Sequence, residues 1–144
     1  MYKRQHPPLS SLFFGGGTPS LMPPILVERL IRHAQDSFGF TDNIEITAEA
    51  NPTSVEAEAM LGFRKAGVNR VSMGVQSLDD ASLKFLGREH SAADALQALD
   101  KVNKAFDRVS IDLIYALPNQ SPKAWQAMLG QALSLIHISE PTRR

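Results

Sequence analysis

The chain contains no cysteine among its 144 residues. This absence excludes disulfide bonds, a cysteine-ligated zinc site and an iron–sulfur cluster held by this chain alone, because all three need cysteine sulfur. An excess of charge of either sign is also missing, since 15 lysines and arginines balance 15 aspartates and glutamates. The composition therefore gives no electrostatic indication of a nucleic acid or an anionic membrane, and we expect a small-molecule partner.

Long hydrophobic runs are absent as well. No apolar stretch approaches the roughly 20 residues that span a bilayer, and the first residues, MYKRQHPPLSS, lack the apolar core of a signal peptide. We therefore expect no transmembrane segment and a cytoplasmic location. A hydrophobic content of 43% in a chain of this length is enough for one domain with a substantial core.

What the sequence does contain is an alternation of short strand-like runs with longer segments of helical period. Residues 23–37 carry Leu26, Leu30 and Ala34 on one stripe, and a second apolar stripe follows Ser91. The second stripe consists of Leu96, Leu99, Val102 and Phe106, and the expected strands are residues 9–14, 43–50, 69–75 and 108–117. This order predicts an α/β fold of βα units around a parallel sheet.

Local signals predict where several helices begin and end. Thr53 with Glu56, and Ser91 with Asp94, have the spacing of capping boxes. Ser121 before Pro122 is typical of a helix start, because proline is favoured at the first helical position. Further signals are the glycines at expected helix ends, Gly67 and Gly87.

Side-chain alternation predicts that each strand has one apolar and one polar face. Apolar residues alternate with polar ones along the last three strands, and Glu49, Gln76 and Asp112 come near the strand ends. Ligands bind at the carboxyl ends of parallel strands in α/β folds. Exposed edge or capping residues are the alternative interpretation. A polar ligand would supply the partners that such residues need inside a barrel.

Three consecutive glycines follow the first strand. Gly15, Gly16 and Gly17 form the first βα turn at the same carboxyl end, and glycine permits positive φ and close approach to the backbone. No Lys-Ser/Thr follows, so the turn is not a P-loop, and Ser20 stands where the dinucleotide pattern needs its third glycine. A tight turn without a ligand and a turn that contacts a different ligand both remain open.

Five ordered segments carry a family resemblance. FFGGGTPS, EITAEANPTS, GVNRVSMGVQS, LKFLGREH and SIDLIYALPNQ together resemble the radical S-adenosylmethionine family of oxygen-independent coproporphyrinogen III oxidases and their haem-chaperone relatives. The match runs from about Leu9 to Leu135. It implies an incomplete (β/α) barrel in which S-adenosylmethionine lies across the carboxyl-terminal rim and chelates one iron of a four-iron four-sulfur cluster.

The resemblance also implies a set of cofactor-binding residues. The glycine turn would meet the methionyl end of S-adenosylmethionine, and polar residues from later motifs would surround its methionyl and ribose groups. Carboxylates and amides can bind an ammonium or ribose hydroxyls, and a guanidinium can pair with a carboxylate. The implied residues are Gly16, Gly17, Thr18, Glu49, Gln76, Arg88 and Asp112.

Two departures from the family pattern shape the expected domain organisation. The family's CxxxCxxC cluster motif belongs after a first barrel strand upstream of this sequence, and the chain has no cysteine. The last residues, IHISEPTRR, do not follow the family and look like a cloning or read-through scar. We expect residues 9–135 to form the central part of the barrel, about four βα units without the first strand and the C-terminal part. Residues 1–8 are an expected disordered or truncated start, and 136–144 an expected non-native tail.

The resemblance implies one of two functions for the parent protein. EANPTS and GVQSLDDASLKFLGREHS are closer to the haem-chaperone branch than to the oxidase branch, which decarboxylates coproporphyrinogen in haem biosynthesis. Haem or a porphyrin is then a partner of the longer protein. The candidate haem ligands are His6, His33, His90 and His137, although solvent-facing or capping roles are expected for each. The fragment alone should be inactive without the cluster. An unrelated barrel enzyme that binds phosphate through GGGT is a second alternative.

Overall fold

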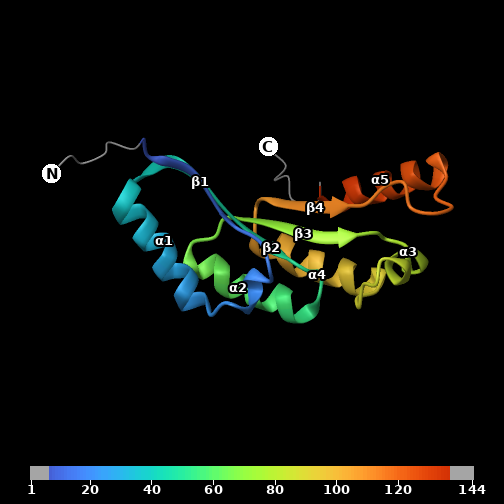
Figure 1. The fold of residues 1–144 in the computed structure, drawn as a ribbon, viewed down its shortest axis with the longest axis horizontal. Helices are drawn as coiled ribbons and strands as arrows, with labels where there is room; N and C mark the ends of the chain where they lie inside the picture. Colours follow the sequence, from blue (N-terminus) through green and yellow to red (C-terminus); the bar gives the residue numbers. More distant parts are fainter. Residues whose placement is uncertain (1–6, 137–144) are drawn as a thin grey trace, which may run out of the picture.

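A computed structural model describes residues 7–136 of the chain. Four strands alternate with helices in the order expected for βα units (Figure 1). The strands are β1 (Leu9–Phe14), β2 (Phe40–Ala50), β3 (Arg70–Gln76) and β4 (Val109–Leu113). The helices are η1 (Pro19–Leu21), α1 (Pro24–Phe38), α2 (Ser54–Ala66), α3 (Asp80–Phe85), α4 (Ala92–Ala105) and α5 (Pro122–Ile136).

The four strands form one parallel sheet in the order β1-β2-β3-β4. The predicted α/β class and parallel βα arrangement are therefore confirmed. Two strand boundaries differ from expectation by more than one residue. β2 begins at Phe40 rather than residue 43, and β4 ends at Leu113 rather than residue 117. The chain leaves the extended conformation after β4, and Ala116 has a φ of 59°.

The core lies on the face of the sheet that α1, α2 and α4 cover (Figure 1). The predicted alternation is clear in β3, whereas Thr47 on the polar side of β2 is buried like its apolar neighbours. Val71, Met73 and Val75 of β3 are fully buried, whereas the residues between them are half-buried. Buried partners on this side are Ile46, Ala48, Ala57, Met60, Phe63, Leu99, Val102 and Phe106.

The apolar stripe of α1 is centred one position away from the expected one. Val27 and Ile31 are buried, whereas Leu26 and Leu30 are 42% and 43% exposed. Positions 27 and 31 are one turn apart and face the sheet and α2. Leu26 and Leu30 lie about 100° further round the helix, on a side that no element of residues 7–136 buries.

Most of the predicted helix boundaries are confirmed. Ser91 and Asp94 form a reciprocal capping box at the start of α4. The hydroxyl of Ser121 accepts a hydrogen bond from the amide of Ala124, and α5 begins at Pro122. Left-handed backbone follows α2 and α3 at Gly67 and Gly87, respectively.

The capping box expected at Thr53 is only half formed. The Thr53 hydroxyl accepts from the Glu56 amide at 3.2 Å, but the Glu56 carboxylate binds the backbone amide and side-chain amide of Asn51 instead. The amide of Thr53 already donates to the carbonyl oxygen of Asn51, so it is not available for the reciprocal bond.

The predicted end segments fall mostly outside the described residues. Residues 1–6 and 137–144 are not described, so the expected start and tail stay predictions there. Helix α5 includes Ile136, the first residue of the expected tail. Among residues 7–136, no helix is both long enough and apolar enough to cross a membrane.

Candidate functional site

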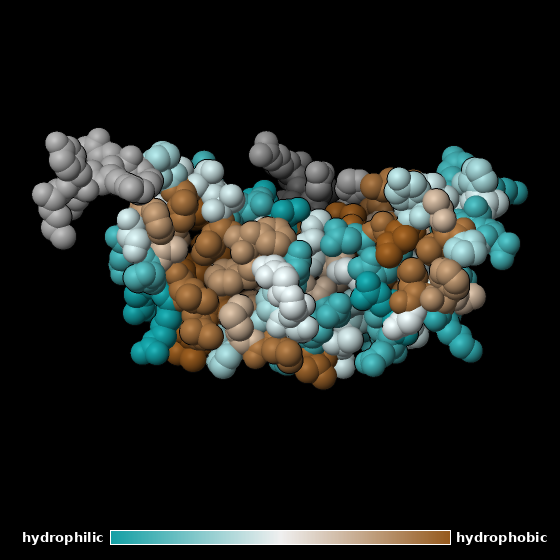
Figure 2. All heavy atoms as spheres, in the orientation of Figure 1, coloured by the Kyte–Doolittle hydropathy of each residue, from teal (hydrophilic) through white to brown (hydrophobic). Residues whose placement is uncertain are grey.

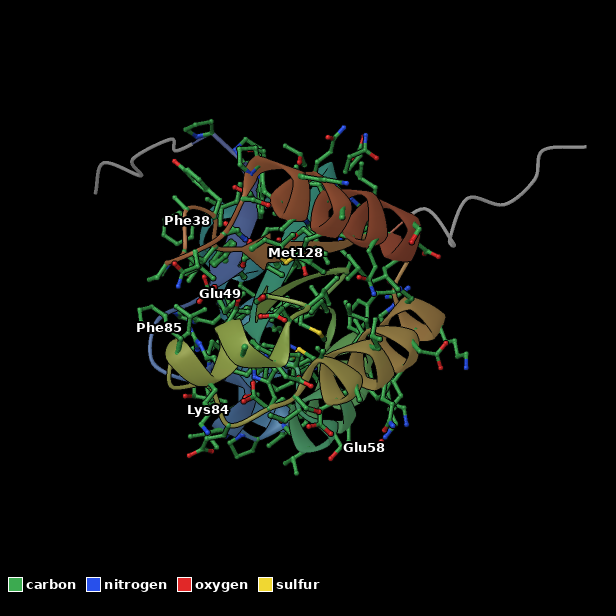
Figure 3. All side chains as sticks on the ribbon, turned by 90° about the vertical axis from the view of Figure 1, so that its right-hand side faces the viewer. Phe38, Glu49, Glu58, Lys84, Phe85 and Met128 are labelled. Carbon is green, nitrogen blue, oxygen red and sulfur yellow. The ribbon has the colours of Figure 1, made fainter. Side chains whose placement is uncertain are left out.

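The polar face of the sheet is opposite the helix-covered core. Glu49 of β2 and Asp112 of β4 alternate with core residues on their strands, and they carry their carboxylates on this face. Glu49 is half-buried and Asp112 is exposed. Figure 3 looks onto the side of the molecule toward which β3 and β4 run, and it labels Glu49 there.

Glu49, Gln76 and Asp112 lie at different heights along their strands. Glu49 pairs with Ser72, which pairs with Ser110, so Asp112 lies two residues further along its strand. Gln76 pairs with Leu113, after a register shift that begins at Met73. Parallel strands in a barrel-like sheet are staggered, and the polar residues therefore ascend across the sheet in steps.

The glycine turn lies beside Glu49. The backbone amide of Gly16 donates to Oε2 of Glu49 at 3.2 Å. Gly16 and Gly17 have φ values of 76° and 59°, and a Cβ at either position would meet no atom within 4 Å. The turn therefore needs glycine for its backbone conformation, and the space next to Gly16 and Gly17 is open. The glycine turn and Glu49 are therefore in direct contact.

A shallow cavity of about 280 Å³ opens at the same turn. Phe13, Phe14 and Met22 give it an apolar wall, and Gly15, Gly16, Thr18 and Pro19 complete its lining. Thr18 is half-buried and makes no side-chain cap to η1. Two residues further along the chain, the hydroxyl of Ser20 is buried without a hydrogen-bond partner in residues 7–136.

Asp112 ends a hydrogen-bond network that crosses three strands. The hydroxyl of Ser72 donates to Oδ2 of Asp112 at 3.1 Å, and the hydroxyl of Ser110 donates to Ser72 at 3.3 Å. Arg70 donates to Ser110 at 3.1 Å and also forms an ion pair with Glu45, 3.1 Å away. Further contacts to Glu45 come from Arg108 and Thr47.

This network contains residues that the sequence interpretation did not select. Ser72, Ser110, Arg70 and Glu45 occupy the polar positions of the same alternating strands, and that alternation was the available signal. What the sequence could not show is the register, which places Ser72 next to Ser110. The group of side chains bonded to Glu45 lies toward the start of the strands, away from the glycine turn. We therefore infer that this group holds the strands together.

Gln76 occupies an unusual backbone conformation. Its φ is 67°, and the amide of Ser77 donates to the carbonyl oxygen of Val75 at 2.8 Å. A hydrogen bond from the amide of residue i+2 to the carbonyl oxygen of residue i, with a positive φ at the residue between them, defines the rare and strained form of the γ-turn. The amide of Ile114 donates to the carbonyl oxygen of Gln76 at 2.9 Å. Strained residues of this kind cluster at functional sites, which supports the choice of Gln76 as a candidate.

A sulfur atom supports the segment that follows Gln76. The Sδ atom of Met128, in α5, accepts from the hydroxyl of Ser77 at 3.6 Å and from the amide of Leu78 at 3.4 Å. Figure 3 labels Met128 near the middle of this end of the molecule. Ser77 is fully buried, and its hydroxyl also accepts from the amide of Asp79 at 3.1 Å.

Arg88 lies apart from the polar residues on the strands. It is exposed on the loop between α3 and α4, and the structure shows only its backbone amide bonded, to the carbonyl oxygen of Leu83 at 2.9 Å. The predicted role of Arg88 therefore stays a prediction.

The two described histidines lie in different surroundings. His33 is exposed on α1, whereas the ring of His90 is buried and its Nε2 lies 3.2 Å from the carbonyl oxygen of Val75. A carbonyl only accepts, so this nitrogen carries a proton and its lone pair cannot bind iron. His6 and His137 lie outside the described residues.

The residues fit S-adenosylmethionine but not an iron–sulfur cluster. The first and last strands are three spacings apart, roughly 14 Å, so a ligand that contacts the turn and Asp112 must be elongated. The space beside the glycines is open, so a ligand can approach the turn. The carboxylates have further acceptor positions, which can bind the amine and hydroxyl groups of such a molecule. The chain has no cysteine, and residues 7–136 contain no group of three metal-ligating side chains.

The chain belongs to the radical SAM superfamily, whose family profile matches residues 1–132. It is 46% identical over 122 residues to the cow protein "Radical S-adenosyl methionine domain-containing protein 1, mitochondrial". It is 43% identical over 134 residues to the heme chaperone HemW of Haemophilus influenzae. These matches cover 84% and 91% of this chain. The predicted family resemblance is confirmed.

Solved structures support the same fold. The structure of coproporphyrinogen III oxidase HemN from Escherichia coli, described as a radical SAM enzyme, matches with a TM-score of 0.72 and 31% identity, over 88% of this chain and 29% of that one. The archaeal Elp3 of Methanocaldococcus infernus matches with a TM-score of 0.67 and 21% identity, which shows the fold alone. This chain spans 28% of the cow relative and 35% of the Haemophilus relative.

Proposed function

We propose that this chain is an S-adenosylmethionine-binding segment of a longer radical SAM protein. The main observation that supports this proposal is the hydrogen bond from the Gly16 amide to Glu49. It joins the glycine turn to the polar face that also bears Asp112. The proposed contacts are Gly16, Gly17, Thr18, Glu49, Gln76, Arg88 and Asp112. Membership of the radical SAM superfamily favours S-adenosylmethionine over a phosphate ligand for this turn.

The longer protein is proposed to be a haem chaperone with haem or a porphyrin as its partner. The similarity to proteins named heme chaperone HemW supports this choice. A coproporphyrinogen III oxidase is the second candidate, favoured by the 31% identity to HemN. We retain a cytoplasmic location as part of the proposal, although the cow relative carries the word mitochondrial in its name.

In this proposal, the chain's own residues bind and orient the ligand, and the cluster belongs to the longer protein. The chain supplied with iron, sulfide and reductant should therefore assemble no cluster and release no 5′-deoxyadenosine from S-adenosylmethionine, because it has no thiolate ligand. When bound in the longer protein, the cluster would supply the electron that cleaves S-adenosylmethionine.

A titration of the ¹⁵N-labelled chain tests the binding proposal. S-Adenosylmethionine should shift the amide resonances of Gly16, Gln76 and Asp112, whereas inorganic phosphate at the same concentration should not. Gly130, in α5, is a control position away from the glycine turn. Shifts with phosphate alone, or no shift at the three amides, would contradict the proposed ligand. A haem titration of the longer protein, followed by absorbance, tests the chaperone function separately.

A further inference from the structure

Of the three proposed ligand-binding residues on strands, Glu49, Gln76 and Asp112, only Gln76 has a positive φ. Its positive φ ends the regular pairing of β3, and its side chain folds back over Gly74. A Cβ at Gly74 would lie 2.8 Å from Nε2 of Gln76. Any side chain at position 74 would therefore occupy the place that the Gln76 amide takes.

His90 fixes the backbone on the other side of the same residue. Its Nε2 donates to the carbonyl oxygen of Val75, which also accepts from the amide of Ser77 to close the turn around Gln76. The histidine ring is 8% exposed and comes from a loop, directly before the cap of α4 at Ser91. A buried bond to this carbonyl favours the peptide orientation that the turn requires.

The loop that carries His90 also carries Arg88, two residues earlier. The contact between His90 and Val75 therefore connects the loop that bears one proposed ligand residue with the strand end that bears another. Neither His90 nor Gly74 is proposed as a ligand contact, because Nε2 of His90 is bonded to the carbonyl oxygen of Val75 and glycine has no side chain.

We propose that His90 and Gly74 are positioning residues for Gln76. His90 holds the turn that directs Gln76 onto the polar face, and Gly74 leaves the space in which the Gln76 amide lies. This inference rests on the proposed binding of S-adenosylmethionine by Gln76. It explains two features that the proposed contacts leave unused, a buried histidine and a glycine inside a strand.

The test for Gly74 is a double-mutant cycle in the full chain, with S-adenosylmethionine affinity measured by NMR titration. Gly74→Ala should weaken binding about as much as Gln76→Ala, roughly fivefold to tenfold for one hydrogen bond. In the Gln76→Ala background, Gly74→Ala should have no further effect on affinity, because the amide that it displaces is gone. Equal losses in both backgrounds would overturn the role of Gly74, since they would indicate a general effect on the strand. Gly130→Ala is the matched control, because a Cβ there meets no atom within 4 Å.

The test for His90 compares two substitutions. His90→Ala should weaken S-adenosylmethionine binding by a similar factor and move the backbone and side-chain amide resonances of Gln76 in the ligand-free chain. His90→Gln retains a donor and should recover part of the affinity. Unchanged Gln76 resonances in folded His90→Ala, or an equal loss of affinity in both variants, would overturn the role of His90.

The ligand-free spectra separate this inference from the proposed function. If Gln76→Ala leaves the affinity unchanged, the proposed contact of Gln76 fails and the positioning role fails with it. If Gln76→Ala weakens binding while His90→Ala and Gly74→Ala do not, only the positioning role is wrong. The Gln76 resonances of ligand-free His90→Ala and Gly74→Ala report whether the residue has moved in these two variants.

Discussion

The hydroxyl of Ser72 donates to Oδ2 of Asp112 at 3.1 Å and joins β3 to β4 on the polar face of the sheet. This neutral donor satisfies only part of what a carboxylate can accept, since each carboxylate offers about four acceptor positions. Asp112 is exposed, so its remaining positions face open space. The same residue can therefore hold a neighbouring strand and bind a hydroxyl group of a ligand.

Asp112→Asn should separate these two roles. The asparagine carbonyl can still accept from Ser72, so the fold should persist, whereas bonds from ligand hydroxyls lose their charge assistance. We expect S-adenosylmethionine binding to weaken by about 1 to 3 kcal/mol, with little change in the ligand-free melting temperature. NMR titration and a thermal melt measure the two quantities. Glu49→Gln should behave in the same way, with the amide of Gly16 as its retained partner.

Two variants serve as controls for this measurement. Ser72→Ala removes the strand-to-strand bond and leaves the carboxylate, so it should lower the melting temperature slightly and affect affinity less than Asp112→Asn. Val71→Asp places an unpaired charge at a fully buried position and should unfold the chain whatever its ligand. A lower melting temperature with unchanged affinity in Asp112→Asn would assign Asp112 to structure alone.

The sequence predicted much of the fold because its signals are local. Alternating apolar residues on β3 and the capping pair Ser91 and Asp94 depend on neighbours a few residues away, and the structure confirms both. The predicted apolar stripe on α1 is wrong by one position, because Leu26 and Val27 are equally apolar. Only the position of the sheet and α2 decides which of them is buried.

The candidate site was predictable in its members and not in its arrangement. Glu49 and Asp112 follow from alternation, but the stagger between them depends on hydrogen-bond register across strands. The turn at Gln76 is set by His90, which is 14 residues later in sequence, and by the pairing with Ile114. Contacts of that range leave no periodic signal in a single sequence.

The glycine turn should be sensitive to alanine through its backbone alone. Gly16→Ala introduces no contact within 4 Å but forces an L-residue to a φ of 76°, which costs roughly 1 to 2 kcal/mol of folding free energy. Gly130→Ala, in the interior of α5 with equally open surroundings, should instead stabilise the chain by about 0.5 to 1 kcal/mol. Urea unfolding of both variants measures the difference. Equal effects of the two substitutions would contradict the assigned conformation of the turn.

Acid should weaken two helix caps. Two hydrogen bonds from Ser91 lower the pKa of Asp94, the larger effect coming from the side chain and the smaller from the backbone. Ser82 lowers the pKa of Asp79 in the same way, again more through its side chain than through its backbone. The unfolded chain then binds protons more tightly at these sites. Their contribution to stability is present above the ordinary aspartate pKa of 3.8 and is lost as the pH falls through the lower native values.

Asp94→Asn should therefore lower the melting temperature at pH 7 and reduce the further drop between pH 5 and pH 2.5. Ser91→Ala removes the hydroxyl side of the same cap and should cost about 1 kcal/mol at neutral pH. Melts at several pH values measure both effects. Asp107→Asn is the comparison, an exposed aspartate after the end of α4. An acid dependence of Asp94→Asn as steep as that of the parent chain would show that this cap does not contribute.

The 144-residue chain should associate in solution, because its sheet has two outer strands and its surface has apolar areas. β1 and β4 each pair on one side only within the described sheet, and outer strands of this kind invite pairing with other chains. Ile25, Leu26 and Leu30 of α1 are 61%, 42% and 43% exposed, and Figure 2 shows apolar surface over this end of the molecule.

Sedimentation velocity across a concentration series should therefore show reversible growth in mass, and the melting temperature should depend on concentration. The double variant Leu26→Glu and Leu30→Glu should reduce association while keeping helix α1, since both positions are over 40% exposed and glutamate is a good helix former. Val27→Glu is the contrasting variant, because it buries a charge against the sheet and should unfold the chain. A monomer at every concentration, with a cooperative and concentration-independent melt, would contradict this prediction. It would show that the outer strands and the face of α1 stay exposed to water without causing association. Association that persists unchanged in the double variant would instead assign it to the strand edges.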